Sequence, residues 1–305
     1  MSNAIPLLEG TDASGGFLVR DTYGATLQNT IRRESAVMSV SRVDRVPGKR
    51  QKYTVYAGRP TAAFVAEAAA KPVTGAELAE VSVDVKKIAT TVLYTEELLE
   101  DAVEDPRVLV NADVEGAFTD LIDAHALGYA NGAAITGQFN SELTNTTQTH
   151  ELGSTGDAFA LSVSACLEDI ESNGGNPTAI VAASDVRANL RDARKAVETT
   201  EAVYSDGFGR EPDTLYGKSI RFTSNLDAFP AGAGKVAAVV GDYTHAVFAM
   251  RRDLSVRFSD QATVDVSGTL HHLWQQNKVA AQWEMRIGFF AHDLNRMFSQ
   301  VTNAS

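Results

Sequence analysis

The stretch FVAEAAAKPVTGAELAE, residues 64 to 80, is the feature that most restricts how this chain can fold. It contains an alanine triplet, a Lys71-Pro72 step and a Thr-Gly turn signal, a combination that suits neither a buried helix nor a buried strand. The flanking segments, KYTVYAG and VSVDVKK, alternate in hydrophobicity as strands do. We therefore predict a long hairpin over residues 45–85 that carries a turn-rich insert.

Such a hairpin has little apolar core of its own, and an isolated two-stranded hairpin is only marginally stable in water. The rest of the chain is globular in composition, with 305 residues of which 44% are hydrophobic, enough for one large or two ordinary domains. We therefore expect the hairpin to be stabilised by an outside partner.

Charge and hydropathy exclude two broad classes of protein. Asp and Glu total 39 against 27 Lys and Arg, a formal charge of -12, which argues against a nucleic-acid binder that coats phosphates. No apolar run approaches the roughly 20 residues of a membrane span, and the N-terminus MSNAIPLLEG lacks the pattern of a secretory signal. The expected location is a cytoplasm, or a particle assembled there.

Motifs for catalysis or for cofactor and metal binding are missing from the sequence. Cys166 is the only cysteine and is expected on a buried helix face, so intramolecular disulfides and cysteine-based metal clusters are excluded. His271 and His272 are adjacent in a strand-like stretch, so their rings point to opposite faces and cannot share a metal. No GxSxG, HExxH or GxGxxG pattern occurs. We expect no cofactor, no metal and no enzymatic activity, although an enzyme that uses carboxylates and histidines of an inserted domain stays an alternative.

The longest helix signal begins at Pro106 and is expected to end at Asn131-Gly132. A shorter helix precedes it, with Thr95 as its N-cap. The apolar positions of the long helix, which we expect to face the core, are Val110, Val114, Ala117, Leu121, Ala124 and Gly128. The acidic positions, which we expect to face away from it, are Asp113, Glu115, Asp120 and Asp123.

Elsewhere the chain alternates helical and strand-like segments. Residues 1–20 have the composition of an extended arm, and residues 23–40 weakly indicate a short helix. A helix is expected over residues 158–171, followed by a short buried strand, TAIVAA. The last third is strand-rich, so we expect an α+β fold whose second domain is inserted within the first.

Several segments together resemble the major capsid proteins of tailed double-stranded DNA bacteriophages, with the Hong Kong ninety-seven-like fold. These segments span most of residues 15 to 298 in the order of that family. They are GGFLV, FVAEAAAKP with TGAEL, VDVKKIATTVLYTEELLED, LYGKSIRFTSNL, GDYTHAVFAMRRDLSVRFSD and NKVAAQWEMRIGFFAHDL. No single motif decides the resemblance, but the combination is specific.

The resemblance implies a division of the chain into the parts of that family's fold. These are an N-terminal arm at 1–44, an extended hairpin called the E-loop at 45–85, a peripheral domain with a spine helix at 86–156, an inserted axial domain at 157–262, and returning peripheral strands at 263–305. The stretch from residue 64 then corresponds to the E-loop tip, which lies over a neighbouring subunit. Phe64, Glu67, Lys71 and Pro72 are the implied inter-subunit contacts.

The resemblance also implies a function and partners. The chain would self-assemble as hexamers and pentamers into an icosahedral shell around the double-stranded DNA genome, without sequence-specific binding and without a membrane. Its acidity suits a wall to which DNA does not adhere. A portal protein, a scaffolding protein and decoration proteins are the other implied partners. GGFLV begins at Gly15, which leaves no room for a long scaffolding segment, so we expect a separate scaffold or none. An encapsulin-like compartment shell is the alternative within the same fold.

Some members of that family join subunits covalently. A lysine of the E-loop forms an isopeptide bond with an asparagine of a neighbouring subunit, helped by a glutamate. By position the matching residues here are Lys71, Asn277 and Glu284. The chemistry requires the glutamate to take a proton from the ammonium, so that the free amine can attack the carboxamide and expel ammonia. An ordinary salt bridge or a solvated lysine is the alternative for these residues.

Overall fold

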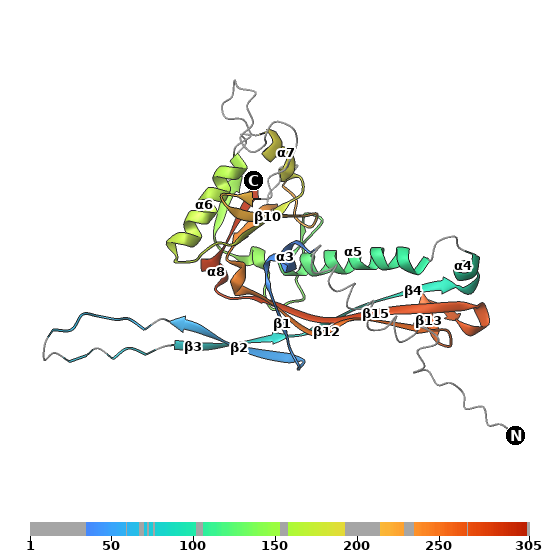
Figure 1. Ribbon diagram of the computed structural model, residues 1–305. Coiled ribbons are helices and arrows are strands. Elements are labelled where there is room, and N and C mark those ends of the chain that lie inside the picture. The colour runs from blue at the N-terminus through green and yellow to red at the C-terminus, as the bar shows by residue number, and fades with distance from the viewer. Residues whose placement is uncertain are drawn as a thin grey trace.

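The computed structural model describes residues 35–58, 60–66, 70–71, 73–75, 77–101, 106–152, 158–192, 214–228, 235–266 and 268–303. Two bodies of secondary structure meet in it (Figure 1): a long, narrow layer and a compact part that stands on it, with a hairpin extending from one end of the layer. Residues 1–34 lie outside the described residues, and with them the arm expected at 1–20 and most of the weak helix at 23–40. Only α3, Ala36–Val40, is described from that helix.

The long layer is a four-stranded sheet with a helix along one face (Figure 1). Its strand order is β1 (Arg42–Arg45), β12 (Ala246–Ser259), β15 (Lys278–Ala291) and β4 (Lys86–Thr95). β15 pairs antiparallel with both β12 and β4 along most of its length. Alternate residues of β15 fill the core on the helix side: Trp283, Met285, Ile287 and Phe289.

The helix on this layer is α5, Pro106–Leu127, and it confirms the predicted spine helix and its start. The preceding α4, Glu96–Asp101, also begins as predicted, because the Thr95 hydroxyl accepts a hydrogen bond from the Leu98 amide at 3.3 Å. The predicted end of α5 was wrong. The helix stops at Leu127 because Gly128 adopts a φ of +82°, a conformation that glycine tolerates. Asn131-Gly132 forms instead the turn between β5 (Tyr129–Ala130) and β6 (Ala133–Ala134).

The predicted buried face of α5 was also wrong in part. Leu121 is 40% exposed and Ala117 is exposed, whereas Asp123, expected outside, is only 3% exposed. Over the part of the helix whose burial is described, from residue 110 on, the buried side chains are Val114, Phe118, Thr119, Ile122, Asp123, Ala124, Ala126 and Leu127. A carboxylate at 123 is tolerated in this face because α3 provides hydrogen-bond donors to it.

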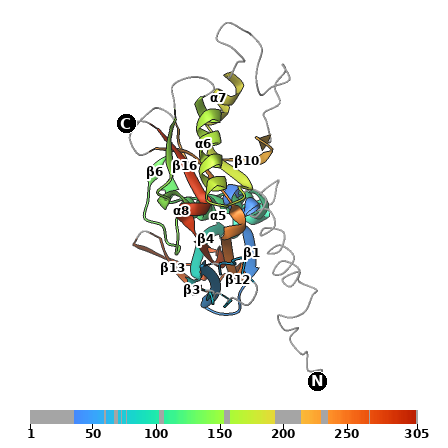
Figure 2. The same ribbon diagram turned by 90° about the vertical axis from the view of Figure 1, so that its left-hand side faces the viewer.

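The compact part is a six-stranded sheet flanked by helices (Figure 2). Its strand order is β7 (Thr149–Leu152), β16 (Phe298–Asn303), β11 (Val236–Gly241), β8 (Ala179–Ala183), β10 (Lys218–Thr223) and β9 (Thr214–Leu215). The helices are α6 (Ala158–Ser172) and α7 (Val186–Asp192). The predicted helix from Ala158 and the predicted buried strand TAIVAA are both confirmed. Cys166 is buried on α6 as expected, and burial raises the pKa of its thiol to about 12.

The chain crosses between the two sheets at a different place from the boundary expected near residue 262. β11 leads through a 3₁₀ turn, Tyr243–His245, directly into β12 of the long sheet. The return runs through α8, Leu294–Met297, into β16 of the compact sheet. The two crossings are adjacent, since the His292 amide donates to the His245 carbonyl at 3.0 Å. β12 therefore belongs to the long sheet and β16 to the compact one.

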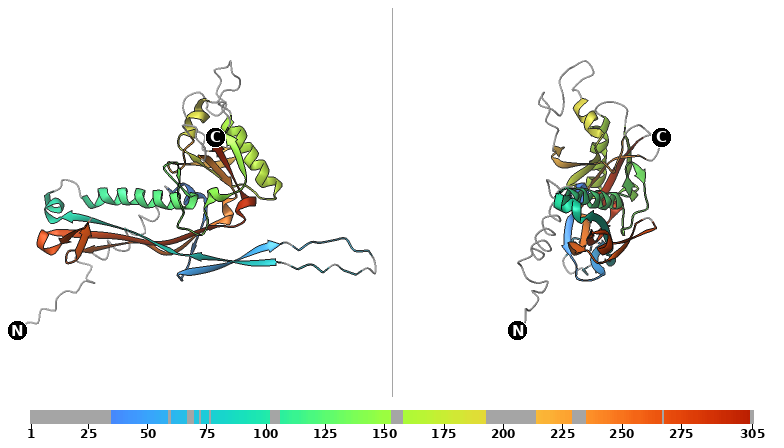
Figure 3. Two further views of the ribbon diagram at one scale, coloured as in Figure 1. Left: turned by 180° about the vertical axis from the view of Figure 1, so that it is seen from behind. Right: turned by 90° about the vertical axis from the view of Figure 1, so that its right-hand side faces the viewer.

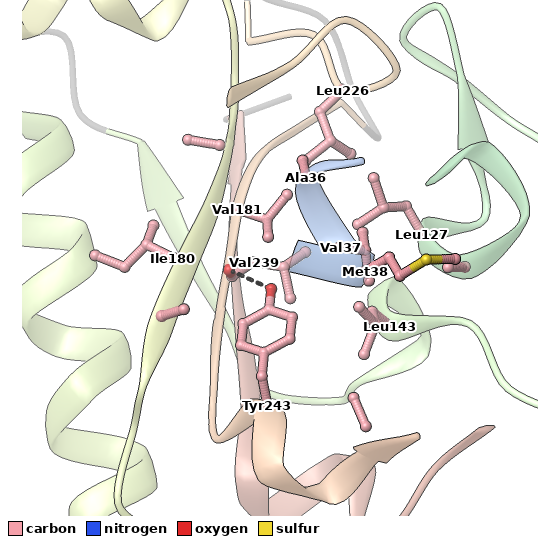
Figure 4. Close-up of a cluster of buried hydrophobic side chains, with 14 of the residues drawn as sticks. Ala36, Val37, Met38, Leu127, Leu143, Ile180, Val181, Leu226, Val239 and Tyr243 are labelled. Carbon is pink, nitrogen blue, oxygen red and sulfur yellow. Dashed lines mark hydrogen bonds between the residues drawn. The ribbon is translucent and has the colours of Figure 1, made fainter. Parts of the chain in front are cut away.

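A continuous core joins the two bodies at this junction (Figure 4). Tyr243 is fully buried there, and its hydroxyl donates to the Val239 carbonyl at 3.1 Å. Side chains from α3, α5 and the compact sheet belong to the same cluster, so the first described element of the chain is part of the core. The labelled members of the cluster are Ala36, Val37, Met38, Leu127, Leu143, Ile180, Val181, Leu226, Val239 and Tyr243.

Candidate inter-subunit surface

The expected hairpin is present and extends away from the long layer (Figures 1 and 3). β2, Arg50–Gly58, pairs antiparallel with β3, Glu77–Asp84, from Arg50 opposite Asp84 to Gly58 opposite Glu77. The Lys52 ammonium and the Glu80 carboxylate form a cross-strand ion pair at 2.7 Å. Both of these side chains are largely exposed, so the pair adds little to stability.

The tip of the hairpin exposes large apolar side chains to solvent. Within the tip, residues 59–76, Phe64 is 110% exposed and Val73 is 98% exposed, and Val65 is also exposed. Leu78, in the adjoining β3, is exposed as well. Within the described part of the tip, the Thr74 hydroxyl donates a hydrogen bond to the Thr61 carbonyl at 3.1 Å. Lys71 is exposed, whereas Glu67 and Pro72 lie outside the described residues. An exposed apolar tip of this kind indicates a surface that is covered by another molecule.

The root of the hairpin, in contrast, is firmly held on the long sheet. A second apolar cluster forms there from Val46, Val83, Val85, Val247, Ala249 and Phe290, and Tyr53 packs on Phe290 with ring centroids 4.8 Å apart. The Asn140 side chain accepts from the Asp84 amide at 3.0 Å and donates to the Ser82 carbonyl at 3.3 Å. The hairpin is therefore a projecting arm with a fixed root and an uncovered tip.

A close backbone approach explains one glycine of the root. A Cβ on Gly288 of β15 would lie 2.8 Å from the Asp84 carbonyl oxygen and 3.0 Å from a methyl group of Val83. β3 ends directly over this glycine. A side chain at position 288 would push β3 away from the sheet. Glycine at this position therefore allows the hairpin root to pack closely on β15.

Glu284, one of the three predicted crosslinking residues, lies in the middle of β15 and is only 7% exposed. Side chains alternate along a strand, so it faces away from the spine helix, opposite to Trp283 and Met285. Three cations surround its carboxylate: Lys87 at 3.2 Å, Arg286 at 3.2 Å and Arg252 at 3.8 Å. Burial opposes ionisation, but the hydrogen bonds and charges of Lys87 and Arg286 outweigh it and hold the pKa of Glu284 below its usual value.

Asn277 lies at the other end of the molecule from the hairpin tip. It is exposed, follows the 3₁₀ turn Trp274–Gln276 with a φ of 47°, and its carbonyl accepts from the Glu96 amide at 2.8 Å. α4, which Glu96 begins, lies at the end of the long layer opposite β2 and β3 (Figure 1). Seven residues along a strand span about 23 Å, so Asn277 and Glu284 are also well separated. One chain therefore does not bring Lys71, Asn277 and Glu284 together.

The histidine pair lies in a small hairpin near Asn277, formed by β13, Thr263–Val266, and β14, Thr269–His272. The Nδ1 of His271 lies 3.1 Å from Gln276 and from the Lys278 ammonium, and the Nδ1 of His272 lies 3.1 Å from Thr263. The two rings thus have separate partners.

Within the described residues no group of three or more His, Cys, Asp and Glu side chains is placed to hold a metal. Among the helices described, none has the length and apolarity that a bilayer crossing requires.

Three features of this surface were missed by sequence reasoning. Asn140 sits in a polar loop, and nothing local in the sequence indicates that it contacts β3 across more than fifty positions. Gly288 did carry a signal, because a glycine inside a strand pattern often marks a close backbone approach. The cations around Glu284 come from three different strands, and their convergence depends on strand register.

One family model and several solved structures are similar to this chain. The profile of the phage capsid family matches residues 15–293. No curated protein sequence gives a significant match. Among solved structures, a chain from Gordonia phage Cozz has a TM-score of 0.73 and 20% sequence identity over 89% of this chain and 87% of that chain. A chain from Microbacterium phage Oxtober96 has a TM-score of 0.72 and 18% identity over 89% and 91%. The capsid of an empty GTA particle has a TM-score of 0.63 and 17% identity over 98% and 100%.

Proposed function

Because the chain belongs to the phage capsid family, it is a major capsid protein and a component of a virion, and we propose that its copies join through the hairpin tip. In this proposal the tip of one copy lies over the long layer of the next and buries Phe64 and Val73 there. Burial of two large side chains of this kind contributes several kcal/mol in total, at roughly 1.5–3 kcal/mol each.

One observation carries this proposal: an arm whose root is fixed and whose tip is uncovered. Asn140, Gly288 and the apolar cluster around Phe290 hold the root against the long sheet. Phe64 and Val73, by contrast, are almost fully exposed. An arm of this form presents its apolar side chains at a defined distance from the body, which favours a repeated contact between identical copies.

The finer features of assembly are part of the same proposal. The closed shell would consist of hexamers and pentamers around double-stranded DNA, with a portal protein, a scaffolding protein and possible decoration proteins as partners, and it would form in the bacterial cytoplasm. The net charge of -12 supports a shell that encloses DNA without adhering to it. The role is structural, so turnover of a small substrate has no part in it.

Hydrogen exchange on the two states of the full chain tests the proposal. We expect the described tip amides, within residues 60–66, 70–71 and 73–75, to exchange freely in the unassembled subunit and to be protected in particles seen by electron microscopy. Amides of β15 serve as the control, because they are paired on both sides within one chain and should be protected in both states. Tip amides that exchange equally fast in assembled particles would contradict this function of the tip.

A further inference from the structure

A buried carboxylate connects the spine helix to the first described element of the chain. Asp123 of α5 accepts three hydrogen bonds from the start of α3: from the Ser35 hydroxyl at 2.6 Å, the Ala36 amide at 2.8 Å and the Val37 amide at 3.2 Å. The Ser35 oxygen in turn accepts from the Met38 amide at 2.9 Å. Asp123 thereby satisfies amides at the N-terminus of α3 that the short helix cannot pair internally.

The α3 segment is inserted in the core at the junction of the two bodies (Figure 4). Ala36, Val37 and Met38 are buried, and the segment packs against α5, β8 and β10. Ser35 is the first residue that the structure describes, so α3 is the first described element in the core. The contacts of one side chain, Asp123, therefore help to determine whether α3 stays attached there.

We propose that Asp123 and the start of α3 form a proton-responsive latch, which acid tightens and neutral or alkaline pH loosens. The latch is a property of the single folded chain. It does not depend on the contact proposed for the hairpin tip, so either can fail without the other.

The groups around Asp123 determine the direction of the response. Burial, the largest effect, raises the pKa of Asp123 to about 6, and Asp120 adds to the rise, while the hydrogen bonds from Ser35, Ala36 and Val37 oppose it. Tyr243 is the neighbouring ionisable group across the junction, and burial also raises its pKa. The residues of α3 and β8 have no ionisable side chains. On α5, His125 follows Asp123 by two residues. On β10, the ionisable residues are Lys218 and Arg221.

The sign follows from comparing the attached and released states. Release of α3 exposes the Asp123 carboxylate to water, where its pKa returns toward the usual value of about 3.9. The attached state therefore binds more protons between about pH 4 and pH 6, and attachment is strongest below that window and weakens as pH rises through it. These two pKa values give a rise of about tenfold in the opening constant of the latch between pH 5 and pH 7.5.

Native-state hydrogen exchange of the full-length, unassembled subunit measures this opening. The probes are the amides of Ala36, Val37 and Met38, with rates corrected for the intrinsic effect of pH on exchange. We expect about tenfold greater opening at pH 7.5 than at pH 5 for the wild type. Asp123→Asn removes the titrating group and should reduce the difference to less than about twofold. Asp113→Asn, an exposed position on the same helix, is the matched control and should keep the wild-type response.

A second variant keeps the test decisive if Asp123→Asn does not fold. Ser35→Ala removes one donor to the carboxylate and leaves the spine helix unchanged, so it should raise opening at both pH values and retain the dependence on pH. Opening that is equal at pH 5 and pH 7.5 in the wild type, or a pH response that persists in Asp123→Asn, would overturn the proposal.

Discussion

At the residue scale, an isopeptide bond from Lys71 depends on whether the Glu284 carboxylate can accept a proton from the lysine ammonium. Lys71 and Asn277 are both exposed and lie at opposite ends of the molecule, which is compatible with a meeting between two copies. Glu284, however, is already paired with Lys87, Arg286 and Arg252. Since these cations lower its pKa, it is a weak proton acceptor in the single chain. We infer that any isopeptide bond requires those ion pairs to rearrange on assembly.

The bond itself can be tested on boiled particles in detergent. If Lys71 is joined to Asn277, wild-type particles should run as ladders, and Lys71→Arg should run as a single monomer band, because a protonated guanidinium is too poor a nucleophile. Lys52→Arg, in the same hairpin, is the control and should keep the ladder. Glu284→Gln is a less clean test, since it also leaves three cations without their carboxylate. A monomer band from mature wild-type particles would reject the bond.

Asp123 and Leu121 show why residue positions on the spine helix could be predicted only in part. The apolar period correctly indicated a long helix with one buried face. It placed that face one position away from where it lies, because leucine was assumed to be inside and aspartate outside. The donors that make Asp123 tolerable lie 86 to 88 positions earlier in the chain. Such a pairing depends on tertiary contact, which periodicity does not contain.

At the element scale, the hairpin divides into a root that the fold determines and a tip that it does not. Its strands were predictable from alternation, and so was the lack of an internal partner for the tip. The root was not, because it depends on β3 crossing β15 at Gly288 and on Asn140 reaching β3 from a loop.

The position at which the chain crosses between the two sheets was predicted wrongly for a related reason. β12 and β16 are assigned to their sheets by pairing, and composition does not change at those points.

Two glycine substitutions test the importance of the root. Gly288→Ala adds a methyl group 2.8 Å from the Asp84 carbonyl, so β3 must shift, and we expect a loss of about 1–3 kcal/mol in the free energy of unfolding. Gly116→Ala is the matched control, because nothing lies within 4 Å of its new Cβ on α5, and it should stabilise the subunit by up to about 1 kcal/mol. Urea denaturation of unassembled subunits measures both. Equal effects of the two substitutions would count against a tight root.

At the scale of the whole molecule, stability and assembly are assigned to different parts of the chain. The core runs without a break from the long sheet through the spine helix into the compact sheet, and the cluster around Tyr243 connects them. The hairpin tip adds little to this core, since Phe64 and Val73 are exposed in the single chain. The fold class and the capsid family were predictable because many segments occur in the family's order.

Removal of the tip separates these two roles. Gly58 and Glu77 face each other in the hairpin register, so an Asn-Gly turn in place of residues 59–76 should close β2 and β3 without strain. The shortened subunit should unfold within about 0.5 kcal/mol of the wild type, because the tip buries little and a shorter loop costs less entropy to close. It should nevertheless form no shells, as measured by sedimentation and electron microscopy. Shells of normal size from this variant would show that the tip is dispensable, and a large loss of subunit stability would show that the tip contributes to the fold of the single chain.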